Sequence, residues 1–221
     1  MSYVKEKMHL IVITSVIRPK NAPSVFSAGE RFDQLLDSIK SASCKVPDCF
    51  VVVIEGSSYT DDQVKAVMAS GAHHIVHVNV DAYAKSLGEI MLLNTFFRSD
   101  IFLDLTQKHN ILSVSKLSGR YVLTDDFLFH YDGDTCICKI QDPGTTYSGH
   151  GILDTRYYCF SITYLENFLQ GLDKCCQNGI FVDIEHSFYL YQVIPVDKIN
   201  RDKQKINVSG CYAPDGKYVE D

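Results

Sequence analysis

The stretch "HLIVITSVI", residues 9–17, is a continuous run of β-branched and aliphatic side chains. Runs of this kind are typical of a strand that is buried on both faces of a sheet. The next segment, "GERFDQLLDSIKSA" (29–42), instead places its apolar residues at helical spacing. We therefore predict a strand followed by a helix.

The same alternation occurs twice more. Strand-like runs cover 49–56 and 73–80, and helical patterns follow them at 60–71 and 85–97. Three strand–helix units in series predict an α/β fold with a parallel sheet and right-handed crossovers. In such sheets ligands bind beyond the carboxyl ends of the strands.

After residue 100 the order of elements changes. We expect strands at 118–124, 135–141 and 155–163, a helix at 164–179, and at 182–194 a second helix or a helix that runs into a strand. From Asn200 the chain is polar, which predicts a tail or a flap. No linker interrupts the pattern, so we expect one domain, 1–221.

Composition excludes several classes of protein. The 221 residues carry a formal net charge of −6, which argues against a nucleic-acid partner. The eight cysteines lack the paired spacing of zinc or redox sites, and no signal peptide precedes them, so we expect a cytoplasmic protein with reduced thiols. The longest apolar runs are too short for a transmembrane segment. Oligomeric state is left open.

The two commonest phosphate-binding motifs are absent. No G-x-G-x-x-G follows the first strand, and no G-x-x-x-x-G-K-[ST] occurs. A nucleotide would have to be held by other means.

The stretch "KLSGRYVLTDDF" (116–127) places Asp125 and Asp126 side by side after an apolar pair. Adjacent carboxylates repel each other unless a cation lies near them, and such oxygen ligands commonly bind Mg²⁺ or Mn²⁺ together with a diphosphate. Lys116, Arg120 and Lys85, at a helix start, are candidates for the phosphates. The alternative is a solvated turn.

Polar residues also follow the first two predicted strands. Thr14, Ser15 and Arg18 lie at the end of the first strand, and Glu55 ends the second. Residues at these positions can hold a base and a ribose. They can equally cap helices or form turns.

Two segments of the second half carry candidate catalytic and acceptor residues. "VDIEHSFYLY" groups Asp183, Glu185 and His186, which can orient an acceptor hydroxyl, carry a proton or ligate a metal. "YSGHGILDTRYYCF" (147–160) offers His150, Asp154 and Arg156 in and after a glycine-flanked loop. An amphipathic helix and a surface turn are the structural alternatives.

In their order along the chain, these features resemble the GT-A-fold, nucleotide-sugar-dependent glycosyltransferases. The likeness rests on the strand ends at Thr14, Ser15 and Glu55, the "KSLGE" helix start, "KLSGRYVLTDDF" and "DIEH", and it covers roughly residues 9–200. Within the family it extends to chlorella-virus-encoded domains of capsid glycan synthesis, which would mean a viral protein in the host cytoplasm. The resemblance implies a central, mostly parallel mixed sheet flanked by helices.

The resemblance also implies roles for residues. Thr14, Ser15 and Glu55 would hold uracil and ribose. The counterpart of the family's Asp-x-Asp metal element would be 124–126, with threonine at the first position, so Asp126 ranks before Asp125 as a ligand of Mn²⁺ or Mg²⁺. His186 or His150 could complete the metal shell.

The expected activity is metal-dependent transfer of a hexose or deoxyhexose from a UDP-sugar to a glycan or glycoprotein acceptor. The likeness favours retention of anomeric configuration, whereas inversion would need Glu185 or Asp183 as a base. A sugar-1-phosphate nucleotidylyltransferase is a rival, although "SVIRPKNAPSVFSAGER" lacks the glycine run of that class. The third possibility is a non-catalytic α/β interaction domain of a longer polypeptide.

Overall fold

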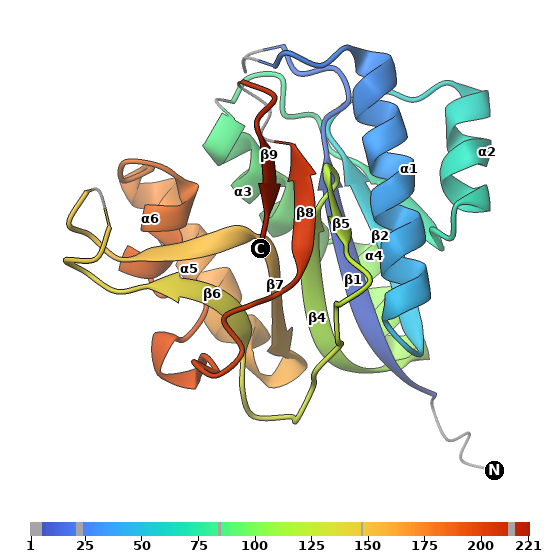
Figure 1. The fold of residues 1–221 in the computed structure, drawn as a ribbon. Coiled ribbons are helices and arrows are strands. Elements are labelled where there is room, and N and C mark those ends of the chain that lie inside the picture. Colours follow the sequence, from blue (N-terminus) through green and yellow to red (C-terminus); the bar gives the residue numbers. More distant parts are fainter. Residues whose placement is uncertain (1–5, 21–23, 84, 147, 212–214) are drawn as a thin grey trace.

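The computed structural model describes residues 6–20, 24–83, 85–146, 148–211 and 215–221. Six strands form the central sheet in the order β3-β2-β1-β4-β7-β6 (Figure 1). They are β1 (Lys7–Ser15), β2 (Cys49–Glu55), β3 (His74–His77), β4 (Asn110–Ser118), β6 (Ile137–Gln141) and β7 (Ile152–Ser161). The first four are mutually parallel, and β7 and β6 are antiparallel to their neighbours. The predicted mostly parallel mixed sheet is confirmed.

Strand β1 is buried on both faces, as its sequence predicts. Leu10 and Val12 pack into one hydrophobic cluster, and Ile11 and Ile13 pack into a second cluster on the other face. All four are at most 1 % exposed. Because alternate side chains of a strand point to opposite faces, an uninterrupted apolar run fits a strand in the middle of the sheet.

Helices cover both faces of the sheet (Figure 1). They are α1 (Ala28–Lys45), α2 (Asp61–Ala69), α3 (Lys85–Phe97), α4 (Asp100–Lys108), α5 (Leu165–Asn178) and α6 (Ile184–Leu190), with 3-10 turns at Ile162–Tyr164 and Val196–Lys198. α1 packs Leu35 and Ile39 with Ile11, whereas α3 packs Ile90 with Leu10 on the opposite face. Among the described residues, no helix is both long and apolar enough to cross a membrane.

The start of α1 is fixed by local sequence. The Ser27 side chain accepts a hydrogen bond from the Glu30 backbone, and the Glu30 carboxylate accepts one from the Ser27 backbone. This reciprocal capping box satisfies two backbone N–H groups that would otherwise lack partners. The helix therefore begins at Ala28, and Arg31 in its first turn donates to the carbonyl of Val16, just after β1, so this end of α1 lies at the carboxyl edge of the sheet.

The strand beside β1 on the side opposite β2 was not predicted. It is β4 (Asn110–Ser118), whereas the strand that we predicted at 118–124 includes only its last residue. The serines of β4 interrupt the apolar pattern that would have indicated a buried strand. Ser113 and Ser115 are nevertheless buried, because Ser113 is hydrogen-bonded to His9 at 2.7 Å and Ser115 to Tyr157 at 3.2 Å. The predicted segment instead contains β5 (Tyr121–Leu123), which belongs to another sheet.

That second sheet also uses the end of the chain. β5 pairs with β8 (Val208–Cys211), which pairs with β9 (Tyr218–Glu220). Leu123 and Val208 are buried in the same cluster as α1, so this small sheet covers the α1 face of the central sheet beside the helix (Figure 1). The predicted tail or flap is thus partly a covering sheet.

Candidate functional site

The carboxyl ends of the four parallel strands form one level edge. Ser15 is in register with Glu55, Glu55 with His77, and Thr14 with Ser118. The chain proceeds from β1 outward to β2 and β3 and then crosses to β4 on the other side of β1. The gap beyond β1 and β4 is therefore the topological switch point, where α/β sheets bind ligands.

Glu55 holds the loops beyond β1 and β2 together. It is fully buried, and its Oε1 accepts hydrogen bonds from the backbone N–H of Ile17 (3.0 Å) and Ser57 (2.8 Å). Its Oε2 accepts from the hydroxyl of Tyr59 at 2.8 Å. Thr14 and Ser15 are also buried at this edge. Glu55 therefore shapes the edge of the site through the backbone.

A cavity of 430 Å³ opens beside Glu55, beyond β2 and β3. Arg18 lines it and donates from Nη1 to the carbonyl of Ser58 at 2.6 Å. His77 lines it as well, with Nδ1 3.0 Å from the carbonyl of Ser57. The remaining lining is polar: Lys20, Gly56, Asn79 and Asp81, with Val78. This wall can accommodate a hydrogen-bonding heterocycle and a ribose.

Lys116 was predicted to contact phosphate, but its ammonium group is already engaged. The residue is 1 % exposed, and Nζ donates to Glu89, to Ser118 Oγ (2.6 Å) and to the carbonyl of Thr155 (2.5 Å). An ammonium group has three N–H donors, so all are used. Lys116 joins β4 to α3 and β7 beneath the site, with no N–H donor left over in this structure.

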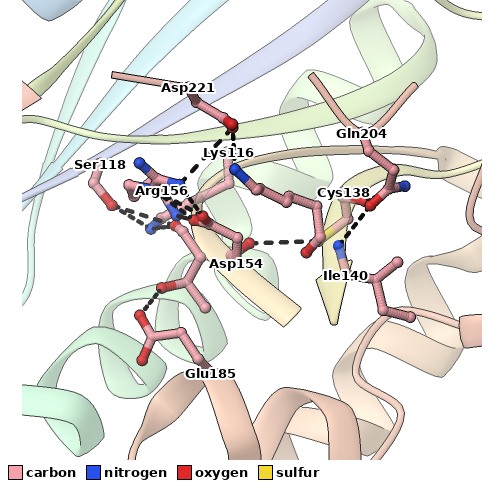
Figure 2. Close-up of polar contacts among 11 residues, drawn as sticks. Lys116, Ser118, Cys138, Ile140, Asp154, Arg156, Glu185, Gln204 and Asp221 are labelled. Carbon is pink, nitrogen blue, oxygen red and sulfur yellow. Dashed lines mark hydrogen bonds and ion pairs between the residues drawn. The ribbon is translucent and has the colours of Figure 1, made fainter. Parts of the chain in front are cut away.

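A second cavity, of 240 Å³, lies on the β7 side of the switch point and is bordered by Asp154, Arg156 and Glu185 (Figure 2). Arg156 donates to Asp154 and forms an ion pair with Asp221. Tyr121 and Lys139 also line the cavity.

Glu185 differs from the other carboxylates of this cavity. The Thr155 hydroxyl donates to its Oε1 at 2.8 Å, and it forms no ion pair among the described residues. Burial, and to a smaller extent the charges of Glu89 and Asp183, raise the pKa of Glu185, although the Thr155 bond opposes this. A carboxylate with a raised pKa in a cavity is suited to take up a proton.

Two arginines occupy the switch point between the cavities. Arg31 donates from Nε to the carbonyl of Val16 (2.9 Å) and from Nη1 to Ser24 Oγ (3.2 Å). Burial and the neighbouring charge of Arg120 lower the pKa of Arg31 to about 10, while Glu55 acts in the opposite direction.

Arg120 is held by the turn that follows β4. Gly119 donates from its backbone to the Thr14 carbonyl at 2.9 Å, and an added Cβ would come within 3.1 Å of that oxygen. The Arg120 guanidinium carbon lies 5.8 Å from the ring centre of Tyr121, as does that of Arg156. Nη1 of Arg120 is buried and has no hydrogen-bond partner among the described residues.

Arg31 was not predicted as a site residue. It lies in the first turn of α1, where a basic side chain opposes the helix dipole, but one such residue has no distinctive pattern in the sequence.

His186 is buried and does not border either cavity. Its Nδ1 is 2.6 Å from Asp183 Oδ1, and its Nε2 is 2.6 Å from Ser148 Oγ. Because both ring nitrogens are engaged, His186 cannot serve as the predicted metal ligand in this arrangement. Asp183 also caps α6 through the His186 N–H. His150 is exposed, with its ring 4.9 Å from that of Phe181.

The structure does not bring Asp125 and Asp126 to this edge. Asp125 lies beyond β5 and accepts from Lys45 Nζ at 2.8 Å. Lys45 ends α1, and Asp48, just after it, accepts a hydrogen bond from His9 near the start of β1. The acidic pair is therefore at the amino edge of the sheet, because β5 returns along α1. The side chain of Lys85 is outside the described structure.

The residues at the carboxyl edge do not fit the Mn²⁺ or Mg²⁺ that the resemblance implies. Such ions require oxygen ligands that are free to coordinate. Glu55 already accepts three hydrogen bonds. Glu89 is paired with Lys116, and Asp154 is paired with Arg156. Within the described ranges, no three His, Cys, Asp or Glu side chains gather in a metal-binding group.

No protein-family model and no curated protein matches the sequence. Among solved structures, the chain is similar to core-mannan synthase A (CmsA/Ktr4) of Aspergillus fumigatus in its Mn/GDP form, with a TM-score of 0.55 and 8 % identity over 91 % of this chain and 74 % of that one. It is similar to the S. cerevisiae mannosyltransferase Ktr4p in complex with GDP, with a TM-score of 0.54 and 7 % identity over 91 % of this chain and 70 % of that one.

A third similar structure is the glycosyltransferase GlyE of Streptococcus pneumoniae, with a TM-score of 0.51 and 11 % identity. The match covers 88 % of this chain but 45 % of GlyE, so this chain spans less than half of that protein. At such identities the likeness concerns the fold. The chain has the GT-A fold of these glycosyltransferases.

Proposed function

We propose that this protein is a glycosyltransferase that moves a sugar from a nucleoside diphosphate sugar to a hydroxyl group of a glycan or glycoprotein. The observation that carries the proposal is the pair of cavities on either side of the switch point, with two arginines between them and Glu185 in the second cavity. The GT-A fold of the neighbouring structures supports it.

The nucleoside would occupy the 430 Å³ cavity, where Arg18, Asn79 and backbone groups offer hydrogen bonds. UDP is the nucleotide that the sequence resemblance favours. GDP is bound in two of the similar structures, so both nucleotides are candidates. The diphosphate would then extend across the ends of β1 and β4, and the sugar would enter the 240 Å³ cavity.

Glu185 is the proposed general base. It would accept the proton of the acceptor hydroxyl while the acceptor oxygen bonds to the anomeric carbon. The bond from that carbon to the phosphate oxygen breaks, and its electron pair leaves with the nucleoside diphosphate. This direct displacement inverts the anomeric configuration, whereas the resemblance favours retention, and NMR of the product decides between them.

The acceptor would approach over Asp154 and Arg156, which border the same cavity as Glu185. Two donors of Arg156 fix both side chains, with Nε 3.0 Å from Asp154 Oδ1 and Nη2 donating to Asp154 Oδ2. Fixed polar groups of this kind can hold sugar hydroxyls in a set orientation.

The test is a donor panel. Purified protein is incubated with UDP- and GDP-sugars, with and without glycan acceptors, and release of UDP or GDP is measured. We expect release with one donor class and a loss of about 10²- to 10⁴-fold in Glu185→Gln, the range typical of a general base. Exposed Glu166→Gln is the matched control.

Two further assays separate the rivals. Formation of pyrophosphate from a nucleoside triphosphate and a sugar-1-phosphate would identify a nucleotidylyltransferase instead. Absence of both activities and of nucleotide binding would favour a non-catalytic interaction domain. The likeness to virus-encoded capsid-glycan enzymes stays a prediction.

A further inference from the structure

The leaving group of the proposed reaction carries several negative charges, which an enzyme must neutralise as the glycosidic bond to phosphate breaks. A divalent cation is one means of doing so. The carboxylates at the carboxyl edge of this sheet do not form a set that fits such an ion, as the occupied Glu55 and Glu89 illustrate. The charge must then be met by side chains.

Most cations near the two cavities are already paired with carboxylates. Lys116 is bound to Glu89, Lys20 to Asp81, and Lys139 to Asp221. Arg156 is paired with Asp154. These groups can contribute little net positive charge to a ligand.

Three arginines are exceptions among the described residues: Arg18, which lines the first cavity and donates to the Ser58 carbonyl, and Arg31 and Arg120 at the switch point. Neither Arg31 nor Arg120 forms an ion pair with a carboxylate of the described residues, whereas the exposed Arg98 and Arg201 both do. Arg31 lies near buried Glu55, but that carboxylate is committed to Ile17, Ser57 and Tyr59. Arg31 is hydrogen-bonded to the backbone just after β1, and Arg120 lies in the turn after the adjacent β4, so two cations without a paired carboxylate meet at this edge, and their like charge is unfavourable until an anion binds.

The geometry of both side chains suits an anion. The hydrogen bonds from Nε and Nη1 of Arg31 to Val16 and Ser24 fix its plane and leave Nη2 without a partner in the described structure. Nη1 of Arg120 is removed from water and unsatisfied. A buried guanidinium N–H without an acceptor is destabilising, and phosphate oxygens match the planar fork of this group.

We propose that Arg120 and Arg31 bind the diphosphate of the donor directly, in the role that the resemblance gives to a metal ion, so that this chain binds its nucleotide without a divalent cation. The inference rests on the proposed glycosyltransferase function. It replaces the predicted metal site at Asp125 and Asp126, which lie at the other edge of the sheet.

The test is isothermal titration calorimetry with UDP, GDP and inorganic pyrophosphate, each in EDTA and in Mn²⁺. Pyrophosphate reports on the diphosphate contacts alone, because it has no base for the first cavity. The variants are Arg120→Gln and Arg31→Gln, with Arg98→Gln as the matched control, since Arg98 is exposed and bound to Asn94 and Asp173. Thermal unfolding checks that each variant folds.

We expect a nucleotide and pyrophosphate to bind in EDTA with affinities that Mn²⁺ changes less than threefold. Arg120→Gln should weaken both by about 10- to 100-fold, as expected for loss of a charge-assisted hydrogen bond. Arg98→Gln should bind as the unaltered protein does. If Arg120→Gln does not fold, Arg120→Lys and Arg31→Gln carry the test, since each should weaken pyrophosphate binding.

Two results would overturn the inference. Nucleotide binding that requires Mn²⁺ and survives in Arg120→Gln and Arg31→Gln would show a metal site and leave the transferase proposal standing. Absence of nucleotide and pyrophosphate binding under every condition, together with no release of UDP or GDP from any donor, would remove both proposals.

Discussion

Two lysine–carboxylate ion pairs lie at opposite edges of the central sheet, and they differ in burial. At the carboxyl edge, the side chains of Lys116 and Glu89 are 1 % and 21 % exposed. At the amino edge, those of Lys45 and Asp125 are 27 % and 104 % exposed. The first pair is part of a hydrogen-bonded network beneath the candidate site, whereas the second is an ordinary surface contact.

One short stretch of the sequence reaches both the carboxyl and the amino edge of the central sheet. "KLSGRYVLTDDF" begins with Lys116 at the end of β4, turns at Gly119, and returns through β5 to Asp125. Its basic half therefore belongs to the switch point and its acidic half to the far edge. Spacing in the sequence suggested one site, but the turn separates the charges.

The largest loss of stability is expected when the buried ion pair between Lys116 and Glu89 is broken. Lys116→Met should lower the free energy of unfolding by about 3 kcal/mol, because Glu89 loses its cation and two further acceptors lose their donor. Chemical denaturation measures this. Lys45→Met, which breaks the exposed pair, should stay near the error of the measurement. Equal losses in the two variants would contradict the contrast between the edges.

The next effect concerns Glu185 and has opposite signs for activity and stability. Glu185→Gln should abolish most sugar transfer yet stabilise the fold at neutral pH, because burial raises the pKa of the carboxylate and makes its ionised form costly. That cost applies fully above the folded-state pKa and disappears below the unfolded-state pKa. Thermal unfolding of both proteins from pH 4 to pH 8 should therefore show melting temperatures that converge at the acidic end.

Control for this experiment comes from Glu166, an exposed residue in the first turn of α5. Glu166→Gln should leave both activity and the pH dependence of stability unchanged. If Glu185→Gln were less stable than the unaltered protein at pH 7, the carboxylate would have a structural role and not a poised acid–base role.

A smaller loss of stability is expected when the N-cap of α6, Asp183, is replaced. Asp183→Ala removes the acceptor for the His186 N–H and for its ring nitrogen, so the free energy of unfolding should fall by about 1–2 kcal/mol. The matched change is Asp100→Ala in the first turn of α4, where Ser99 and not the aspartate caps the helix. No loss in Asp183→Ala would mean that the capping contact does not hold α6 in place.

The smallest effect on stability and nucleotide affinity is expected from substitutions of Asp125 and Asp126 at the amino edge. The nearby Lys45 lowers the pKa of Asp125, so its contribution to stability exists above the unfolded-state pKa and is lost as the pH falls through the folded-state value. Because Asp125 is fully exposed, Asp125→Asn and Asp126→Asn should change neither stability nor nucleotide affinity measurably. Loss of Mn²⁺-dependent nucleotide binding in either variant would restore the predicted metal site.

The sequence was sufficient for β1, β2 and β3, three of the four parallel strands. The runs that become β1 and β2 are uninterrupted because both faces are buried, and such apolar runs can be recognised in the sequence. β4 escaped prediction because buried serines and Lys116 interrupt its apolar pattern, and their partners are supplied by distant segments such as His9, Tyr157 and Glu89. Tertiary hydrogen bonds of this kind leave no local signal.

The site was predictable to a similar, partial extent. Glu55 was selected because it ends a strand and Glu185 because it is grouped with Asp183 and His186, and the structure places both glutamates beside cavities. Spacing could not show that Lys116 has no free donor or that Asp125 lies at the far edge. Arg31 was missed because a single arginine in a helix has no distinctive pattern until its neighbours in space are known.

The most direct measurement of the central claim is hydrogen–deuterium exchange with and without a saturating nucleoside diphosphate. If the carboxyl edge holds the nucleotide, protection should appear in the backbone after β1, β2 and β4, at 15–20, 55–58 and 118–121, and not at 124–127. Protection confined to 124–127 and the end of α1 would contradict the account and return the site to Asp125 and Asp126.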